Sequence, residues 1–168
     1  MIKCPGKKSR GKYDFNENLF EIKWPNDLLY KRNKLSGLLI ESVVNKNEFI
    51  IGTGINVNQI KFSPSLDNIT TSLKKITGTE IDIEQLLSDI IYGYSENFAL
   101  LREEKDGEIF ELWKSKFKMS GENVRYLNNE GKEEIAQIID INEDGSIKLL
   151  KNGEISNHFS GEIKLRTN

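Results

Sequence analysis

The chain has 168 residues, with 24 Lys and Arg against 26 Asp and Glu, so its formal net charge at pH 7 is −2. This near balance excludes a broad basic face that binds nucleic acid by counterion release. Charged residues make up 30% of the chain, and no apolar run approaches the roughly 20 residues that cross a bilayer. We therefore expect a soluble protein with no membrane association.

The first residues are positively charged but are not followed by an apolar segment, so no secretory signal is predicted and a cytoplasmic location is expected. Cys4 and His158 are the single cysteine and histidine. They exclude an internal disulfide and a zinc cage of several such ligands. Residues 1–18 are rich in Lys, Gly, Asn and Asp and show no hydrophobic period, which predicts a flexible lead-in.

From residue 19 the pattern changes to short apolar runs separated by turn-forming residues. The runs at 19–24, 28–31, 35–44 and 48–57 predict four strands of an antiparallel meander. Helical patterns follow. Residues 68–76 predict a short helix ending at Gly78, and Asp82 is the expected N-cap of a long helix that reaches about residue 101.

Apolar side chains of that long helix recur at intervals of three and four, which predicts one buried face. The residues are Ile83, Leu86, Leu87, Ile90, Ile91, Tyr94, Phe98 and Leu101. Gly107 is expected to end or interrupt the helix, and a further helix is predicted at 108–117. Its aromatic stripe is interpreted as core rather than as a ligand site.

After Gly121 the hydrophobic period returns to two. Short strands are predicted at 124–126, 135–141, 146–150 and 154–158, with hairpin turns at 143–145 and at Asn152-Gly153. Residues 161–166 are expected to close a small SH3-like barrel. A barrel of this size is marginal alone, so it is expected to lean on the preceding domain.

Three segments could carry chemistry. Lys23-Trp24-Pro25-Asn26-Asp27-Leu28 places an amide and a carboxylate after a strand, where they could hold Mg²⁺ or a ribose, or could simply form an Asx turn. Lys34 lies seven residues beyond Asp27 and could neutralise a phosphate or an acyl oxygen. Gly37, Gly52 and Gly54 lie in strands that otherwise suit pairing, and they predict space for a ligand or another backbone.

The Lys23–Leu28 segment, then Lys34-Leu35-Ser36-Gly37-Leu38-Leu39-Ile40-Glu41, then the segment from Gly52 to Asn58, resemble in order the motifs of biotin protein ligases. The ending Ser160-Gly161-Glu162-Ile163-Lys164-Leu165-Arg166 resembles the C-terminal signature of that family. The resemblance implies an α+β fold: residues 19–118 as the C-terminal half of a class II synthetase-like catalytic domain with a partial mixed or antiparallel sheet, and residues 119–168 as an SH3-like β-barrel.

The resemblance also implies a reaction. ATP activates biotin to biotinyl-5′-AMP, and a lysine of a biotin carrier domain then accepts the biotinyl group. By motif position, the resemblance assigns catalysis to Lys34, Asp27 and Lys23, and Mg²⁺ binding to Asp27. It assigns ligand binding to Asn26, Gly37, Leu38, Gly52, Gly54, Asn56, Glu162 and Arg166.

The sequence departs from the family upstream of Lys23. Family members carry a Gly-Arg-Gly-Arg-x-Gly-Arg loop there, and residues 6–12 match it only in glycine and cation content. A truncated form is therefore expected, with the apolar face of residues 35–57 partly uncovered and dimerisation possible. No DNA binding is expected. Two alternatives stay open: a non-catalytic module that binds nucleotide or carrier domain, and a lipoate ligase, which the Trp-Pro-Asn-Asp form disfavours.

Overall fold

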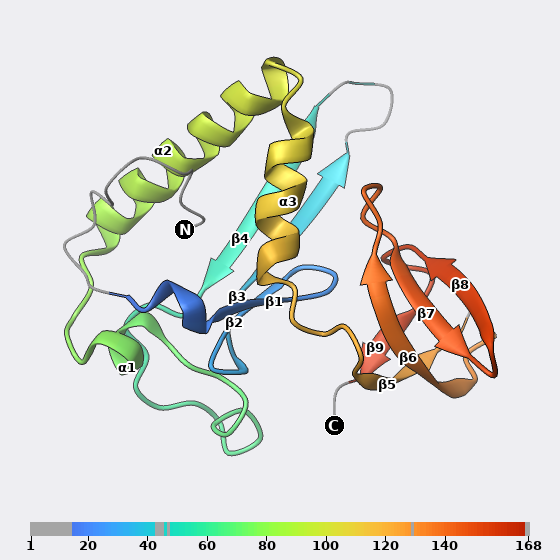
Figure 1. Ribbon diagram of the computed structural model, residues 1–168. Helices are drawn as coiled ribbons and strands as arrows, with labels where there is room; N and C mark the ends of the chain where they lie inside the picture. The colour runs from blue at the N-terminus through green and yellow to red at the C-terminus, as the bar shows by residue number, and fades with distance from the viewer. Residues whose placement is uncertain (1–14, 43–45, 47, 129, 167–168) are drawn as a thin grey trace. The chain divides into compact units, whose positions relative to one another are not determined.

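The computed structural model describes residues 15–42, 46, 48–128 and 130–166. They form an α+β protein with two compact units, as Figure 1 shows. Unit 1 comprises the described parts of 1–22 and 26–116, and unit 2 comprises Lys23–Pro25 and the described residues from Phe117 onward. The division at 116/117 lies two residues before the predicted one. The Gly-rich basic segment at 6–12 and Cys4 lie outside the described residues.

A four-stranded sheet forms the centre of unit 1, in the order β1 (Phe20–Lys23), β2 (Asp27–Tyr30), β3 (Asn33–Ser42) and β4 (Phe49–Ile55). β2, β3 and β4 pair antiparallel, so the predicted meander is confirmed. A short 3₁₀ turn, Glu17–Leu19, precedes β1 and is capped by the Asn16 side chain. Residues before 19 thus pack against the sheet, since the Phe15 ring lies edge-on against Phe20.

Three helices follow in unit 1: α1 (Leu73–Thr77), α2 (Ile83–Arg102) and α3 (Asp106–Lys116). The predicted caps are confirmed, since the Asp82 carboxylate accepts from the Gln85 N–H and Gly78 ends α1 at φ 74°. Among the described helices, none combines the length and the apolarity needed to cross a bilayer.

Two helix boundaries differ from the prediction. α1 begins at Leu73 rather than at residue 68, because the Ile69 carbonyl accepts from the Lys34 N–H, the Thr71 N–H donates to the Lys34 carbonyl, and Ser72 is the N-cap. α2 ends at Arg102, where Glu103 and Glu104 turn, and Gly107 lies inside the first turn of α3. The expectation that Gly107 ends the long helix was therefore wrong.

The apolar residues of α2 do not form one buried face. Leu86, Ile90 and Tyr94 are partly covered, but a parallel stripe stays exposed: Ile83, Leu87, Ile91, Phe98 and Leu101. The stripe is exposed because no described element packs against it. Leu39, Ile40, Phe49 and Ile50 at the far ends of β3 and β4 are exposed as well, which confirms the expected uncovered surface on residues 35–57.

The core of unit 1 is small. Leu35, Leu73 and Ile81 are buried together, so that the inner end of β3, the start of α1 and the approach to α2 share one cluster. Partly buried apolar residues surround it: Phe15, Phe20, Leu28, Ile55, Val57, Ile76 and Leu86. This cluster supports the end of β3 that carries Lys34.

Unit 2 is an antiparallel sheet in the order β8 (Glu154–His158), β7 (Ile147–Lys151), β6 (Glu133–Ile141), β5 (Asn123–Leu127) and β9 (Lys164–Arg166). The strands and the Asn152-Gly153 turn agree with the prediction. The predicted barrel does not close, however, since β8 and β9 are the two edges of the sheet. Alternating residues of β5, β6 and β7 form its core: Val124, Tyr126, Ala136, Ile138, Ile141, Ile147 and Leu149.

The side chain of Trp24 also belongs to unit 2. It is 2% exposed, and its indole N–H donates to the Gly145 carbonyl at 2.9 Å. Gly145 lies in the β6–β7 turn, where the Asp144 carboxylate accepts from the backbone and hydroxyl of Ser146. These bonds hold the pKa of Asp144 below its usual range. Trp24 is therefore a packing residue.

Candidate functional site

A β-bulge in β3 determines where the Lys34 side chain points. Leu28 pairs with Ser36 and Leu29 pairs with Lys34, so Leu35 is the extra residue. In a regular strand, residues three apart face opposite sides of the sheet. The bulge shifts the alternation by one position and places the Lys34 ammonium beside Gly37.

Asp27 completes this arrangement from the neighbouring strand. It pairs with Gly37 across β2 and β3, and its Oδ1 lies 2.6 Å from Lys34 Nζ. The Asp27 side chain is 17% exposed, whereas the Lys34 side chain is 49% exposed. The carboxylate thus orients an ammonium that stays open to a ligand.

Gly37 makes room for this ion pair. A Cβ at position 37 would lie 3.0 Å from Asp27 Oδ1 and 3.3 Å from Lys34 Nζ. Both distances are tighter than ordinary van der Waals contact, so a larger residue would displace the two charged groups. The predicted need for a small residue at position 37 therefore has a physical cause within the chain.

The backbone of Lys34 is held from two sides. Its N–H donates to the Ile69 carbonyl at 2.8 Å, and its carbonyl accepts from the Thr71 N–H at 2.9 Å. The Asn56 amide also donates to the Lys34 carbonyl at 3.4 Å. The sequence analysis did not predict this strap at 69–71. The signal in the sequence is a run of three hydroxyl residues, Thr70, Thr71 and Ser72, all of which are buried in the structure.

Gly54 and Gly52 extend the same face of the sheet. Gly54 pairs with Gly37 and Gly52 pairs with Leu39 across β3 and β4. A Cβ at either glycine would make only ordinary contacts, at 3.8 to 3.9 Å. Their small size is not required by the described chain, so the face next to Lys34 is flat and uncovered there.

Two other predicted ligand residues have structural roles or lie elsewhere. The Asn26 amide donates to the Leu38 carbonyl, and the Leu38 N–H donates back to the Asn26 carbonyl, which fastens the start of β2 to β3. Leu38 pairs with Thr53 on the opposite face from Gly37. On that opposite face Thr53 Oγ1 and the Tyr94 hydroxyl lie 2.7 Å apart, which ties α2 to β4. The structure does not bring Leu38 together with Lys34.

Three predicted site residues lie in unit 2. Lys23 is grouped there with Trp24 and Pro25. Glu162 accepts a hydrogen bond from the Phe159 N–H at 2.8 Å in the turn before β9. Arg166 is in β9, and its side chain lies outside the described part of the chain.

A second polar cluster, in unit 2, is fully satisfied. Glu134 accepts from the Tyr126 hydroxyl at 2.6 Å and lies 2.6 Å from Lys151 Nζ. Burial and this hydrogen bond raise the pKa of Tyr126 to about 12, while Lys151 and Tyr126 lower the pKa of Glu134. His158 lies against the Tyr126 ring and pairs with Ser156. These contacts give the cluster a structural role in unit 2.

Asp27 is the residue predicted to bind magnesium. Among the described residues, no group of three His, Cys, Asp or Glu side chains could hold a metal ion. Asp27 is a single carboxylate and is already ion-paired. Magnesium binding by Asp27 stays a prediction, because Mg²⁺ is usually held by one or two carboxylates together with substrate phosphates.

Comparisons with known proteins indicate the family of this chain. The Biotin/lipoate A/B protein ligase family matches residues 7–58. The bifunctional ligase/repressor BirA of Bacillus subtilis is 31% identical over 150 residues, which covers 86% of this chain and 46% of BirA. Our expectation of no DNA binding stays a prediction, because this match spans about half of the relative.

Solved structures extend the match over both units. The apo biotin protein ligase from Aquifex aeolicus is 32% identical, with a TM-score of 0.77 over 89% of this chain and 66% of that chain. The same enzyme in complex with biotin and ATP has a TM-score of 0.75 over 89% and 62%. With the ordered motifs around Asp27, Lys34 and Gly54, these matches show that the chain belongs to the biotin protein ligase family.

Proposed function

We propose that this chain carries the adenylate-forming face of a biotin protein ligase. It would activate biotin with ATP to biotinyl-5′-AMP and transfer the biotinyl group to a lysine of a biotin carrier domain. The observation that supports this best is the Lys34 ammonium, held 2.6 Å from Asp27 over Gly37 on an open, glycine-lined strand face. The similar Aquifex enzyme is described with biotin and ATP.

In the first step a biotin carboxylate oxygen attacks the α-phosphorus of ATP. The bond from that phosphorus to the β-phosphate oxygen breaks, and pyrophosphate leaves with its electron pair. Negative charge develops on the α-phosphate oxygens, and a fixed cation stabilises it more in the transition state than in the ground state. Lys34 is the residue for this role, because Asp27 and the strap at 69–71 hold it in place before the reaction.

In the second step the neutral amine of the acceptor lysine attacks the acyl carbon of the adenylate. The carbon–oxygen bond to AMP breaks, and the amine loses a proton to give the amide. AMP leaves as a phosphate monoester whose oxygens again carry charge beside Lys34. One ammonium thus stabilises charge on the same α-phosphate in both steps.

Replacing Lys34 tests this proposal. Lys34→Ala should lower biotinyl-adenylate formation, measured as pyrophosphate release and as hydroxylamine-trapped product, by about 10²- to 10³-fold, the usual cost of losing one fixed charge donor. Lys46→Ala is the matched control, because Lys46 is an exposed lysine of the same unit with 62% of its side chain exposed. Equal rates for Lys34→Ala and the unchanged chain would refute the assigned role.

A non-catalytic binding module is the second candidate. The chain spans about half the length of the curated relatives that it matches, and it leaves apolar faces of α2 and the sheet exposed. Calorimetry with ATP, a non-hydrolysable biotinyl-adenylate analogue and a carrier domain distinguishes the two. Binding without pyrophosphate release supports the module, and no heat with any of the three eliminates both functions. Lipoate competition decides against the lipoate alternative if it leaves biotin binding unchanged.

A further inference from the structure

The turn between β2 and β3 has an unusual composition for its shape. Tyr30 pairs with Asn33, so Lys31 and Arg32 alone form the turn, at φ 49° and 64°. Two-residue hairpins with both central residues in the left-handed region strongly prefer Asn-Gly or Asp-Gly, because a Cβ is strained there. Lys31 and Arg32 are both exposed, so burial of their side chains does not compensate for the strain.

The same chain contains the relaxed version of this turn. Lys151 pairs with Glu154 in unit 2, and Asn152 and Gly153 form that turn at φ 52° and 85°. The backbone geometry is matched, whereas the composition follows the usual preference. Backbone strain of this kind persists mainly where the side chains have a function. The comparison thus points to the side chains of Lys31 and Arg32 themselves.

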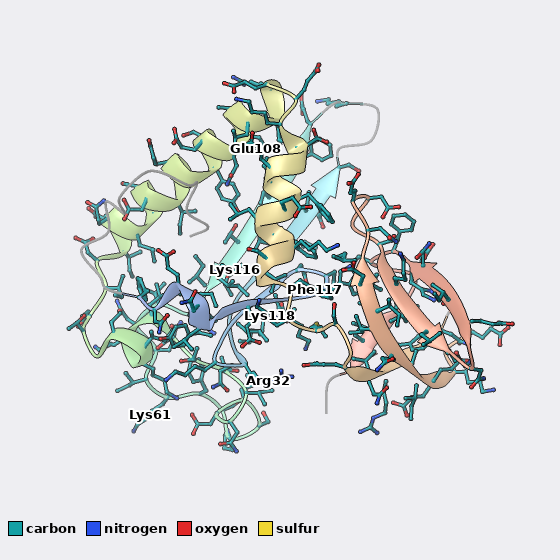
Figure 2. The ribbon with its side chains drawn as sticks, viewed as in Figure 1. Arg32, Lys61, Glu108, Lys116, Phe117 and Lys118 are labelled. Atoms are coloured by element: carbon teal, nitrogen blue, oxygen red, sulfur yellow. The ribbon has the colours of Figure 1, made fainter. Side chains whose placement is uncertain are left out.

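Their position relates the turn to the candidate site. Arg32 is two residues from Lys34 on the same hairpin, which limits their Cα atoms to a separation of about 7 Å. Residues 27–37 contain three cations, Lys31, Arg32 and Lys34, against the single carboxylate Asp27. Figure 2 labels Arg32 at the outer end of this hairpin. The site therefore has a cationic projection at one border.

We propose that the Lys31-Arg32 turn docks an acidic surface of the protein that supplies the acceptor lysine. This inference rests on the proposed function. Sites for small anions are concave and enclose their ligand, whereas a hairpin turn is convex and both of these side chains are exposed. A convex pair of cations suits a macromolecular partner, whose acidic groups it would attract and orient so that the acceptor amine meets the adenylate at Lys34.

The test replaces the strained dipeptide with the relaxed one. Lys31→Asn/Arg32→Gly keeps the turn and should not lower the thermal midpoint, so a loss of binding cannot be attributed to unfolding. A charge-matched variant adds Asn152→Lys/Gly153→Arg, which restores the net charge at the other turn. Lys31→Gln/Arg32→Gln is the third variant and keeps side chains of similar length without charge.

Binding of an unbiotinylated carrier domain to the full chain is then measured by interferometry at low and at physiological salt. The expected result is a rise in Kd of about 10-fold at low salt for all three variants, with loss of the salt dependence. Neutralising the acidic residues that flank the acceptor lysine of the carrier should produce the same rise. Unchanged Kd values, or no carrier binding by the unchanged chain, would overturn the inference.

ATP and biotin affinities complete the design. Each variant should bind ATP, and likewise biotin, with the same affinity as the unchanged chain. Weaker ATP binding by the variants would assign the turn to nucleotide phosphates and would reject the docking inference. Adenylate formation is scored separately. If adenylate forms and the variants bind the carrier as well as the unchanged chain does, only the docking inference fails. If adenylate is neither formed nor bound and carrier binding still depends on the turn, the proposed function fails.

Discussion

The two units differ in how completely they bury their apolar residues. In unit 2, Ile138, Ile147 and Leu149 are fully buried between strands that pair in sequence. In the described part of unit 1, one buried cluster contains Leu35, Leu73 and Ile81, and the long helix α2 has no buried residue. Burial is therefore highest in the smaller unit, and the larger unit keeps apolar surface and a charged site open on the same sheet.

The difference shows that a unit can form regular strands and helices without burying most of its apolar side chains. The four strands and three helices of unit 1 form because caps, turns and backbone pairing are local or nearly local. Its side chains at Leu39, Ile50, Leu87 and Ile91 stay exposed, and exposed apolar patches of this kind mark interaction surfaces or aggregation risk. Unit 2, with its alternating strands, covers its own inner face.

The largest expected change in stability comes from a substitution in the core of unit 2. Leu149→Ala should lower the free energy of unfolding by about 2 to 5 kcal/mol, because Leu149 is 0% exposed and its removal leaves a cavity. Leu39→Ala in unit 1 should change it by less than about 0.5 kcal/mol, since Leu39 is 59% exposed. Urea unfolding in a Trp113→Phe background, with Trp24 as the reporter of unit 2, measures the first change, and circular dichroism measures the second.

Gly37→Ala sharpens the comparison at the site. The added Cβ meets the ends of two flexible side chains, so the fold should tolerate it with a stability change below about 1 kcal/mol. If Asp27 and Lys34 act as proposed, adenylate formation should fall about 10-fold or more, because the added Cβ displaces both groups from their alignment. A large loss of stability, or full activity, would contradict the role given to this glycine. Gly93→Ala in α2 is the control, because a Cβ at position 93 meets nothing within 4 Å.

Trp24→Phe tests how the buried indole supports unit 2. The change removes the hydrogen bond to the Gly145 carbonyl but keeps most of the packing. The thermal unfolding of unit 2 should report a loss of about 1 kcal/mol. A change of several kcal/mol would show that ring shape, rather than the hydrogen bond, dominates at this position.

The stability of unit 2 should also depend on pH in two windows. The pKa of Glu134 is lowered in the folded state, so its contribution is present above the unfolded value and is lost as pH falls through the folded value. The pKa of Tyr126 is raised to about 12, so its contribution is present below the unfolded value and is lost as pH rises toward 12. Glu134→Gln should flatten the acid side of a thermal-midpoint profile, and an unchanged acid limb would reject this assignment.

The sequence by itself determined the local features of this protein. Asp82 and Gly78 marked helix ends, Asn152-Gly153 marked a hairpin, and period-two runs marked the strands, because each depends on the conformational preferences of a few neighbouring residues. The ordered motifs around Asp27, Lys34 and Gly54 also identified the family. Their chemistry is carried by residue type and spacing, which a sequence displays directly.

Only the tertiary structure decided how those residues meet. The bulge at Leu35 places the Lys34 side chain beside Gly37 and Asp27. Residues 69–71, which were predicted to be helical, instead form backbone hydrogen bonds with Lys34. Whether the small sheet closed, and which stripe of α2 was covered, depended likewise on partners far along the chain. Such pairings are set by competition among distant segments for hydrogen bonds and apolar contact, and no local pattern records the outcome of that competition.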